Sequence, residues 1–131
     1  MDNSSGSCGC GAVTYKLNSG ILHVVNCHCN MCRNHNGGSF STYAVLPAES
    51  IEITSGNEFI QQYKANYGIK RFCEKCGTPL FNESAKYPGV WMLFVGTLNS
   101  PENVVPKINV WYENKLTWVD TLADIKSIPQ G

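Results

Sequence analysis

The chain has 131 residues, with 43% hydrophobic and 15% charged side chains, and its ten basic and ten acidic residues cancel to a formal net charge of zero. A chain of this length predicts one domain, residues 1–131, with one hydrophobic core. The cancelled charge argues against nucleic acid or an anionic membrane as a partner, because both are bound through a strongly basic surface.

The N-terminal segment Met1–Ser7 is polar and has neither the basic nor the apolar region of a signal peptide. No apolar run in the chain is long enough to cross a bilayer. We therefore expect a cytoplasmic protein. In that compartment, clustered cysteines are more often metal ligands than disulfide partners.

Short segments of alternating hydrophobicity, separated by turn residues, predict a mainly β chain. The expected strands, in chain order, are residues 12–17, 21–25, 40–46, 51–54, 59–63, 69–72, 90–95 and 107–112. The turn residues 18–20 and 55–57 predict two hairpins, one joining the first two strands and one joining the fourth to the fifth. Short helical turns are expected only at 29–34 and 122–127. The predicted architecture is therefore a set of folded antiparallel sheets.

Aromatic side chains mark the expected core. The continuous apolar run 90–95 predicts a central buried strand. Trp91, Phe94, Trp111 and Trp118 lie on strand-like segments, where aromatic residues are more often core than a platform for a ligand. We predict that all four belong to the core.

Seven cysteines dominate the functional reading of the sequence, and their odd number excludes a complete set of disulfide pairs. They fall in three tight clusters with the C-x-C and C-x2-C spacings of chelating turns. A structural zinc site takes four protein ligands, whereas a catalytic one takes three and keeps a position open. Seven thiols divide naturally into four and three. The clusters are Cys8 and Cys10; Cys27, Cys29 and Cys32; and Cys73 and Cys76.

The two outer pairs predict a structural zinc site. Gly9 and Gly11 let the first turn close tightly, and Gly77 follows the second pair as in a zinc knuckle. Together the pairs supply four soft thiolate ligands, a set that selects zinc over magnesium or calcium. Because the pairs lie far apart in the sequence, metal binding there would contribute to folding stability.

The central triplet predicts a second, different site. Cys27, Cys29 and Cys32 lie within six residues, where a strand ends and a helical turn begins. Three thiolates with water or substrate in the fourth position make a catalytic zinc site. Two alternatives stay open: His35 closes the site as a fourth ligand, or the triplet is a metal-free redox cluster. His28 lies between two of the ligands, so its side chain is expected to point away from a shared metal.

These motifs resemble the glutathione-dependent formaldehyde-activating enzyme family, which includes the centromere protein V group and has an Mss4-like fold. The resemblance rests on residues 6–15 (GSCGCGAVTY), 27–33 (CHCNMCR), 72–80 (FCEKCGTPL) and 95–98 (VGTL). It implies a β-rich, tent-like domain with two zinc ions per chain, the second more labile. Cys8, Cys10, Cys73 and Cys76 would hold the structural zinc, and Cys27, Cys29 and Cys32 the catalytic one.

The resemblance also implies an activity, a carbon–sulfur lyase that joins glutathione to formaldehyde as S-hydroxymethylglutathione. The expected partners are thus a small thiol such as glutathione and a small aldehyde, with no nucleic acid and no membrane. One position departs from the family pattern: Asn109 stands where a histidine is expected after Pro106, Lys107 and Ile108.

Chemistry refines this expectation. A zinc ion that already has three thiolate ligands is a poor Lewis acid, so delivery of a substrate thiolate is favoured over strong carbonyl activation. Basic side chains are candidates for binding the carboxylates of glutathione: Arg33, Lys64, Lys70, Arg71 and Lys75. The competing hypotheses are a non-enzymatic zinc-binding interaction module and a thiol redox or metal-buffering protein.

Overall fold

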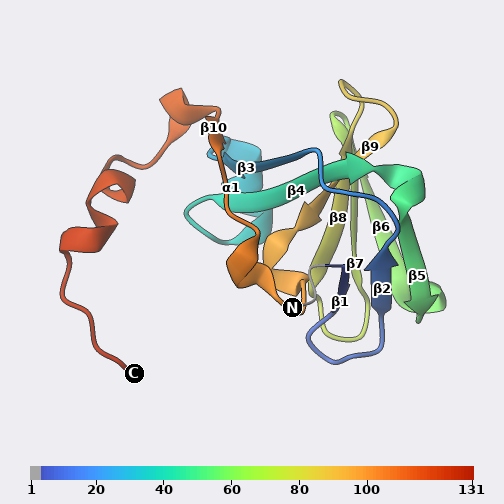
Figure 1. Cartoon of the computed structure of the whole chain (residues 1–131). Coiled ribbons are helices and arrows are strands. Elements are labelled where there is room, and N and C mark those ends of the chain that lie inside the picture. The colour runs from blue at the N-terminus through green and yellow to red at the C-terminus, as the bar shows by residue number, and fades with distance from the viewer. Residues whose placement is uncertain (1–3) are drawn as a thin grey trace.

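The computed structural model describes residues 4–131, so Met1, Asp2 and Asn3 of the polar N-terminal segment lie outside the described residues. The described chain is mainly β, as expected, with a single α-helix (Figure 1). The strands are β1 (Ser5–Ser7), β2 (Thr14–Leu17), β3 (His23–Cys27), β4 (Ser41–Pro47), β5 (Ile51–Ser55), β6 (Ile60–Ala65), β7 (Gly68–Cys73), β8 (Pro79–Ser84), β9 (Val90–Phe94) and β10 (Ile108–Val110). The helix, α1 (Asn30–Asn36), follows β3 directly.

Short 3-10 segments complete the secondary structure of the described residues. They are Ala48–Ser50, Asn57–Phe59, Val95–Thr97, Pro101–Asn103, Tyr112–Asn114 and Thr117–Asp124. The last of these overlaps the helical turn expected at 122–127 but begins earlier. None of the described helices is long and apolar enough to cross a membrane.

The strands form two sheets. The smaller has the order β1-β2-β5, and the larger has the order β10-β3-β4-β9-β8-β7-β6. All the neighbouring strands are antiparallel except β10, which pairs with β3 in parallel, so the large sheet is mixed rather than purely antiparallel. Strand β9 lies between β4 and β8, as expected of a central buried strand.

Both predicted hairpins are wrong. Strand β2 pairs with β1 and β5, whereas β3 pairs with β4 and β10. In the same way, β5 belongs to the small sheet and β6 pairs with β7. The two turns therefore connect one sheet to the other. A turn sequence indicates where the chain reverses, but the partner of each strand is decided by which faces bury their apolar side chains together.

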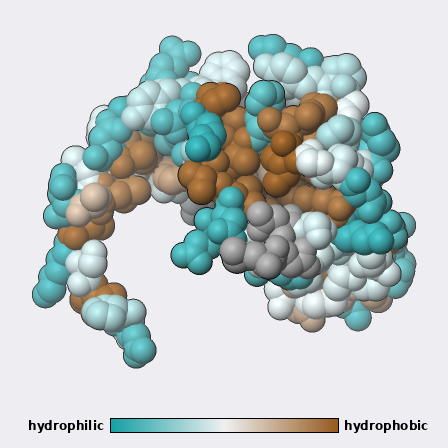
Figure 2. All heavy atoms as spheres, in the orientation of Figure 1, coloured by the Kyte–Doolittle hydropathy of each residue, from teal (hydrophilic) through white to brown (hydrophobic). Residues whose placement is uncertain are grey.

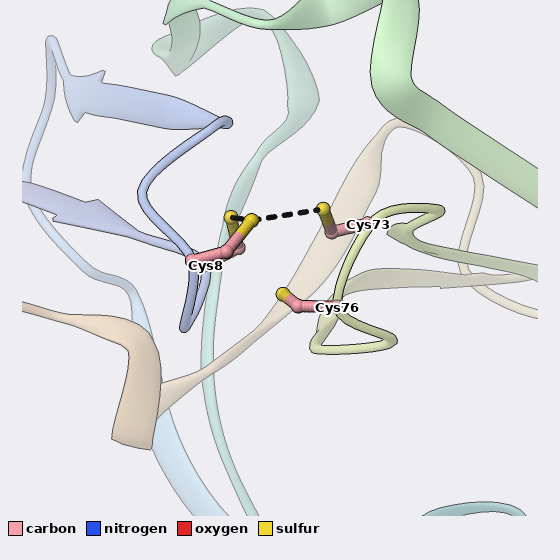
Figure 3. Close-up of side chains that lie close together, drawn as sticks. Cys8, Cys73 and Cys76 are labelled. Atoms are coloured by element: carbon pink, nitrogen blue, oxygen red, sulfur yellow. Dashed lines mark hydrogen bonds between the residues drawn. The ribbon is translucent and has the colours of Figure 1, made fainter.

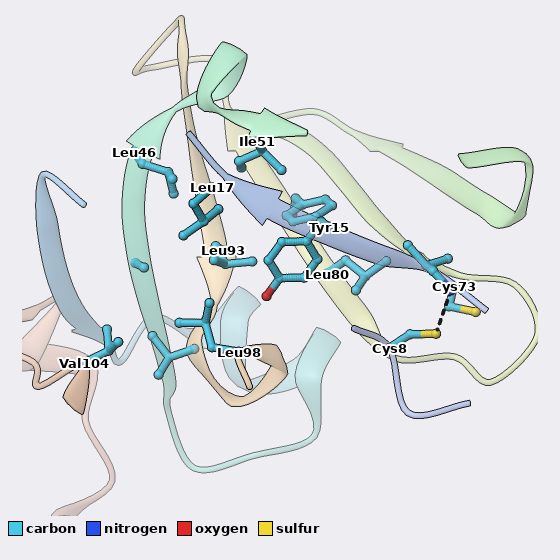
Figure 4. Packing of buried hydrophobic residues seen from close by; sticks show 14 residues of the cluster. Cys8, Tyr15, Leu17, Leu46, Ile51, Cys73, Leu80, Leu93, Leu98 and Val104 are labelled. Carbon is cyan, nitrogen blue, oxygen red and sulfur yellow. Dashed lines mark hydrogen bonds between the residues drawn. The ribbon is translucent and has the colours of Figure 1, made fainter. Parts of the chain in front are cut away.

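The core lies between the two sheets (Figure 4). Tyr15 is fully buried, its ring meets Phe81 edge-on at 5.3 Å, and its hydroxyl shares a 2.7 Å hydrogen bond with the Thr97 hydroxyl. Fully burying an apolar side chain of this size stabilises the fold by about 1.5–3 kcal/mol. Cys8 and Cys73 lie at one edge of this core, so its packing also places the outer cysteine pairs.

The expectation that four aromatic residues form the core is half right. Phe94 is buried and Trp91 packs against the core. Trp111 and Trp118, however, are 56% and 51% exposed, because the chain beyond β10 leaves the sheets. We call residues 115–131 the C-terminal arm. Figures 1 and 2 show it separated from the body, with hydrophobic residues along its length.

The close approach of Gly56 to the backbone of Ala12 can be tested by substitution. The φ of Gly56 is +79°, and a Cβ placed there would lie 1.9 Å from the carbonyl oxygen of Ala12, beside the first cysteine turn. Gly89 has a similar φ of +86° but open space around it. We expect Gly56→Ala to lower the free energy of unfolding by about 3 kcal/mol or more, from backbone strain and overpacking together.

The matched variant Gly89→Ala should cost only the strain of a left-handed alanine, about 1–2 kcal/mol. Chemical denaturation of the wild type and both variants measures the difference. Equal losses would contradict the close approach of Gly56 to Ala12.

Candidate functional site

Four cysteines meet at one edge of the core. Cys8 and Cys10 lie in the turn between β1 and β2, Cys73 ends β7, and Cys76 lies in the turn before β8. Their four sulfur atoms all lie within 4.8 Å of one another, and Figure 3 shows Cys8, Cys73 and Cys76 converging from two separate turns. The structure thus brings together the four residues that the sequence assigned to one site.

Backbone geometry explains why these turns present their sulfurs to one point. Gly77, with a φ of +80°, donates its N–H to the carbonyl of Cys73 at 2.7 Å and so closes the second turn. The Thr78 hydroxyl accepts the N–H of Gly9 at 2.9 Å and thereby joins the two turns. A 3.1 Å hydrogen bond with the same hydroxyl lowers the pKa of Cys76 to about 5. The thiolate is therefore favoured at Cys76. The pKa of Cys10, in contrast, is raised to about 11, because its hydrogen bond with the backbone of Ala12, which lowers the pKa, is outweighed by burial and the neighbouring sulfur of Cys8.

The spacing of these sulfurs fits a tetrahedral metal ion. Zinc binds thiolate sulfur at about 2.3 Å, which places two ligands of a tetrahedron about 3.8 Å apart. The Sγ atoms of Cys8 and Cys10 are 3.6 Å apart, and those of Cys10 and Cys73 are 3.9 Å apart. A disulfide requires about 2.05 Å, and all seven cysteines are free. The donor set is consistent with zinc.

The second cluster lies at the junction of β3 and α1. Cys27 ends β3, Cys29 caps the helix, and Cys32 lies in its first turn, with the three sulfurs within 4.8 Å of one another. Cys29 Sγ accepts the N–H of Cys32 at 3.2 Å, and Cys32 Sγ donates to Cys27 Sγ at 3.4 Å. That bond lowers the pKa of Cys27 and raises the pKa of Cys32. This cluster too can hold a metal ion.

Polar side chains of the large sheet lie next to the triplet. The Tyr43 hydroxyl, on β4, donates to Cys32 Sγ at 3.3 Å. Asn82, on β8, is buried, and with its amide oxygen turned toward these groups it lies 3.2 Å from that hydroxyl and accepts from Lys70 Nζ at 3.3 Å. Burial lowers the pKa of Lys70, and the negative charge of the three cysteines opposes this shift. Lys70 thus lies next to Tyr43, which contacts the triplet, through the Asn82 oxygen.

Two further groups lie in this region. The Tyr67 hydroxyl is buried and has no hydrogen-bond partner among the described residues. Burial raises the pKa of Tyr67, and the charges of Cys32 and Cys29 add to this rise. The ring of His35 lies 5.7 Å from that of Tyr63 and 6.2 Å from that of Tyr67. His35 therefore packs with tyrosines and is not part of the cysteine group.

His28 points away from the triplet, as expected of a residue between two ligands. It is buried between the rings of Phe40 and Tyr112, at centroid distances of 5.1 and 5.3 Å. Its Nε2 lies 3.4 Å from Oδ1 of Asn109, which also accepts from Asn26 at 3.2 Å. The unusual asparagine thus lies beside His28 and outside both cysteine groups.

Most of the basic residues suggested as carboxylate binders have other roles. The Arg33 guanidinium donates to the carbonyl oxygens of His28 at 2.7 Å and Asn114 at 2.6 Å, and to the Asn30 side chain. Arg71 lies on the opposite face of β7 from Lys70 and pairs with Glu83 at 2.6 Å. Lys64 is exposed, and Lys75 lies over the ring of Phe59.

Sequence reasoning did not identify Tyr43, Asn82 or Tyr67 as site residues. They lie on or between strands that are separated in sequence from the triplet, and no local pattern distinguishes them from ordinary sheet residues. The only available signal was strand alternation, which places Tyr43 and Lys70 on the face away from the core. That signal becomes useful only once the strand order is known.

The fold and the two cysteine clusters define a β protein with paired sites for metal binding, and comparison with known proteins agrees. Residues 3–114 match the model of the family described as glutathione-dependent formaldehyde-activating enzyme. The chain belongs to this family, as its motifs suggested, and its mainly β Mss4-like fold is confirmed.

Three relatives are named as candidate glutathione-dependent formaldehyde-activating enzymes. A protein of Halomonas elongata is 27% identical over 88% of this chain and 78% of its own length. Proteins of Penicillium rubens and Aspergillus terreus are 29% and 31% identical over 60% and 56% of this chain. The chain spans only 42% and 39% of these two fungal proteins.

A crystal structure of a Rhodobacter sphaeroides protein has a similar fold. Its TM-score is 0.65 at 21% identity, covering 81% of this chain and 99% of that chain. At this identity the likeness concerns the fold alone.

Arg33 gives a test of how the triplet is held in place. We expect Arg33→Ala to lower the free energy of unfolding by about 2 kcal/mol, because it leaves two carbonyl oxygens without a charged donor. Arg33→Lys should recover only part of this loss, since an ammonium cannot reproduce the planar fork. Thermal and chemical denaturation measure the effect, with Lys64→Ala as an exposed control. A loss no larger than that of the control would contradict this role.

Proposed function

We propose that this chain is a zinc-dependent enzyme of the carbon–sulfur lyase type that acts on the adduct of a thiol and a small aldehyde. The proposed reaction joins glutathione and formaldehyde to give S-hydroxymethylglutathione. One observation carries the proposal: the triplet brings three sulfur ligands together, and no histidine, cysteine or carboxylate of the described residues joins them as a fourth.

We assign two zinc ions to the chain. Cys8, Cys10, Cys73 and Cys76 hold the structural ion, because their four sulfurs supply a complete tetrahedral set. Cys27, Cys29 and Cys32 hold the catalytic ion. The packing of His35 against Tyr63 and Tyr67 supports an open fourth position over a closed one. When bound, a zinc ion with three thiolate ligands supplies a position at which a thiol loses its proton near neutral pH.

The surrounding residues have roles in binding and proton transfer. The substrate sulfur forms a bond to the aldehyde carbon, the electron pair of the C=O bond moves to oxygen, and a proton returns to that oxygen. We assign Lys70 and the Tyr67 hydroxyl as the donors for this oxygen, because Lys70 reaches the Asn82 oxygen beside the Tyr43 hydroxyl and the Tyr67 hydroxyl has no other partner among the described residues. Fixed donors of this kind stabilise charge as it develops.

Tyr43 and Asn82 act as positioning residues. The Asn82 amide oxygen accepts from Lys70 Nζ, and the single proton of the Tyr43 hydroxyl is donated either to that oxygen or to Cys32 Sγ. This short chain of hydrogen bonds orients the ammonium group with respect to the sulfurs. Asn36 donates to Tyr43 from α1 at 3.4 Å, so the helix and the sheet are held together on both sides of the site.

Metal content tests the assignment of the two ions. We expect two zinc ions per chain by elemental analysis, and one of them should be lost quickly to a mild chelator. Cys29→Ser should retain one ion and keep the fold. Cys73→Ser should lose the structural ion and much of its stability, because metal binding there contributes to folding. One zinc ion with three titratable thiols in the wild type would contradict the assignment.

Exchange between formaldehyde and glutathione, followed by NMR with and without zinc-loaded protein, tests the reaction. We expect acceleration by the wild type and none by Cys29→Ser. Lys70→Met should lower the rate about tenfold to a hundredfold, since losing one donor to a developing oxyanion costs up to about 10²–10³ in rate.

Lys64→Met, on the exposed surface of the neighbouring strand β6, is the matched control and should keep the full rate. Lack of acceleration by the zinc-loaded wild type would overturn the reaction with these two substrates. A full rate for Lys70→Met would overturn only the role of Lys70.

A further inference from the structure

The C-terminal arm exposes large apolar side chains that no part of the chain from residue 4 onward covers. None of residues 115–131 is buried. The exposed fractions are 51% for Trp118, 41% for Leu122, 61% for Ile125 and 67% for Ile128. Contiguous apolar exposure of this kind marks an interaction site in soluble proteins.

The arm nevertheless has a defined local structure. Its 3-10 segment Thr117–Asp124 is held by Asp120, which accepts from the Tyr112 hydroxyl at 2.5 Å and from Lys115. Thr121 donates to the carbonyl of Trp118 at 2.9 Å. The arm is therefore an ordered element that lacks a packing partner, rather than a polar tail.

The body carries an open groove of about 420 Å³, lined by apolar and polar groups in similar measure. It lies between the start of β3 and the segment that leads into β10, and it exposes Leu22, Val105 and Ile108. Figure 2 shows hydrophobic residues gathered on the face of the body that lies beside the arm, with open space between the two. The groove is of a size that takes large apolar groups.

The geometry favours a groove on another molecule. Strands β3 and β10 are parallel, so their amino ends lie together at one end of the strand pair, where they form the groove. The arm begins after their carboxyl ends, at the opposite end of the pair. Arg33 fixes this departure by donating to the carbonyl of Asn114. Figure 1 shows the arm leaving near β10 and then running beside the body without touching it.

We propose that the groove binds the C-terminal arm of a second copy of this chain, and that two copies exchange arms about a two-fold axis. In such an arrangement each arm fills the partner's groove, so both apolar surfaces are covered at once.

One charge pair supports this occupant. The arm as a whole is neutral, with Lys115 and Lys126 against Asp120 and Asp124, and Asp120 already pairs with Lys115, so Asp124 is the acidic side chain left to face a basic groove residue. The groove is lined by Lys107 and His23 and contains no acidic residue. Opposite charges at the rim of an apolar contact set its register and discourage other partners.

The exposed area is sufficient for a stable dimer. The arm and groove together expose one aromatic and six aliphatic side chains, each about half exposed, and half of a side chain of this size is on the order of 80–100 Å². Since the contact occurs twice in a two-fold dimer, burial reaches about the 1,200 Å² at which stable interfaces begin.

Sedimentation equilibrium of the full zinc-loaded chain tests the proposal. We expect twice the monomer mass at micromolar concentration. Trp118→Ser and Ile108→Ser, on the two sides of the contact, should each raise the dissociation constant about 30-fold or more, because they remove central apolar anchors. Tyr87→Ser is the matched control, since Tyr87 is 55% exposed in the turn between β8 and β9, outside the arm and groove.

A charge reversal tests the pairing of arm and groove. Lys107→Glu alone should weaken the dimer, and the combination of Lys107→Glu with Asp124→Lys should restore it. A monomeric wild type at concentrations up to about 100 μM, corresponding to a binding free energy weaker than about 5.5 kcal/mol, would overturn the proposal. So would a dimer that none of the arm or groove variants weakens.

Discussion

The meeting of two distant cysteine turns is the constraint on which the rest of the molecule depends. One turn belongs to the small sheet and the other to the large sheet, so the cluster of Cys8, Cys10, Cys73 and Cys76 ties the two sheets together at the edge of their shared core. Cys73 also ends strand β7, and Lys70 lies three residues earlier on the opposite face. Strand β7 therefore contributes Cys73 to the four-cysteine cluster on the core side and Lys70 to the surroundings of the triplet on the outer side.

This arrangement separates two tasks that the same chemical group performs. In the first cluster, Cys8 and Cys73 pack at the edge of the apolar core, where a polar or charged group is costly unless it is bound, whereas Cys10 and Cys76 are exposed. The sulfurs of the triplet lie at the end of β3, on the other side of the large sheet, among tyrosines, an asparagine and a lysine. The sheet between them keeps the two environments apart, so each set of thiols has its own electrostatic surroundings.

The cysteine sets could be predicted from the sequence because chelating turns are local. The spacing of Cys27, Cys29 and Cys32 already contains the geometry that a strand end and a helical turn provide. Strand β8 was missed because its consecutive buried residues, Leu80, Phe81 and Asn82, lack alternation. Likewise Lys70 could be suggested only as one of several basic residues. What selects it is the pairing of β7 with β8, a contact that no short motif contains.

The Arg33 guanidinium connects the triplet to the base of the C-terminal arm. One of its nitrogens, Nη1, donates both to the carbonyl of His28, between two cysteines of the triplet, and to the carbonyl of Asn114, at the base of the C-terminal arm. A load on the arm is therefore transmitted through a single planar group to the peptide that separates Cys27 from Cys29. A partner that binds and moves the arm is therefore expected to change the distance between the sulfurs of Cys27 and Cys29.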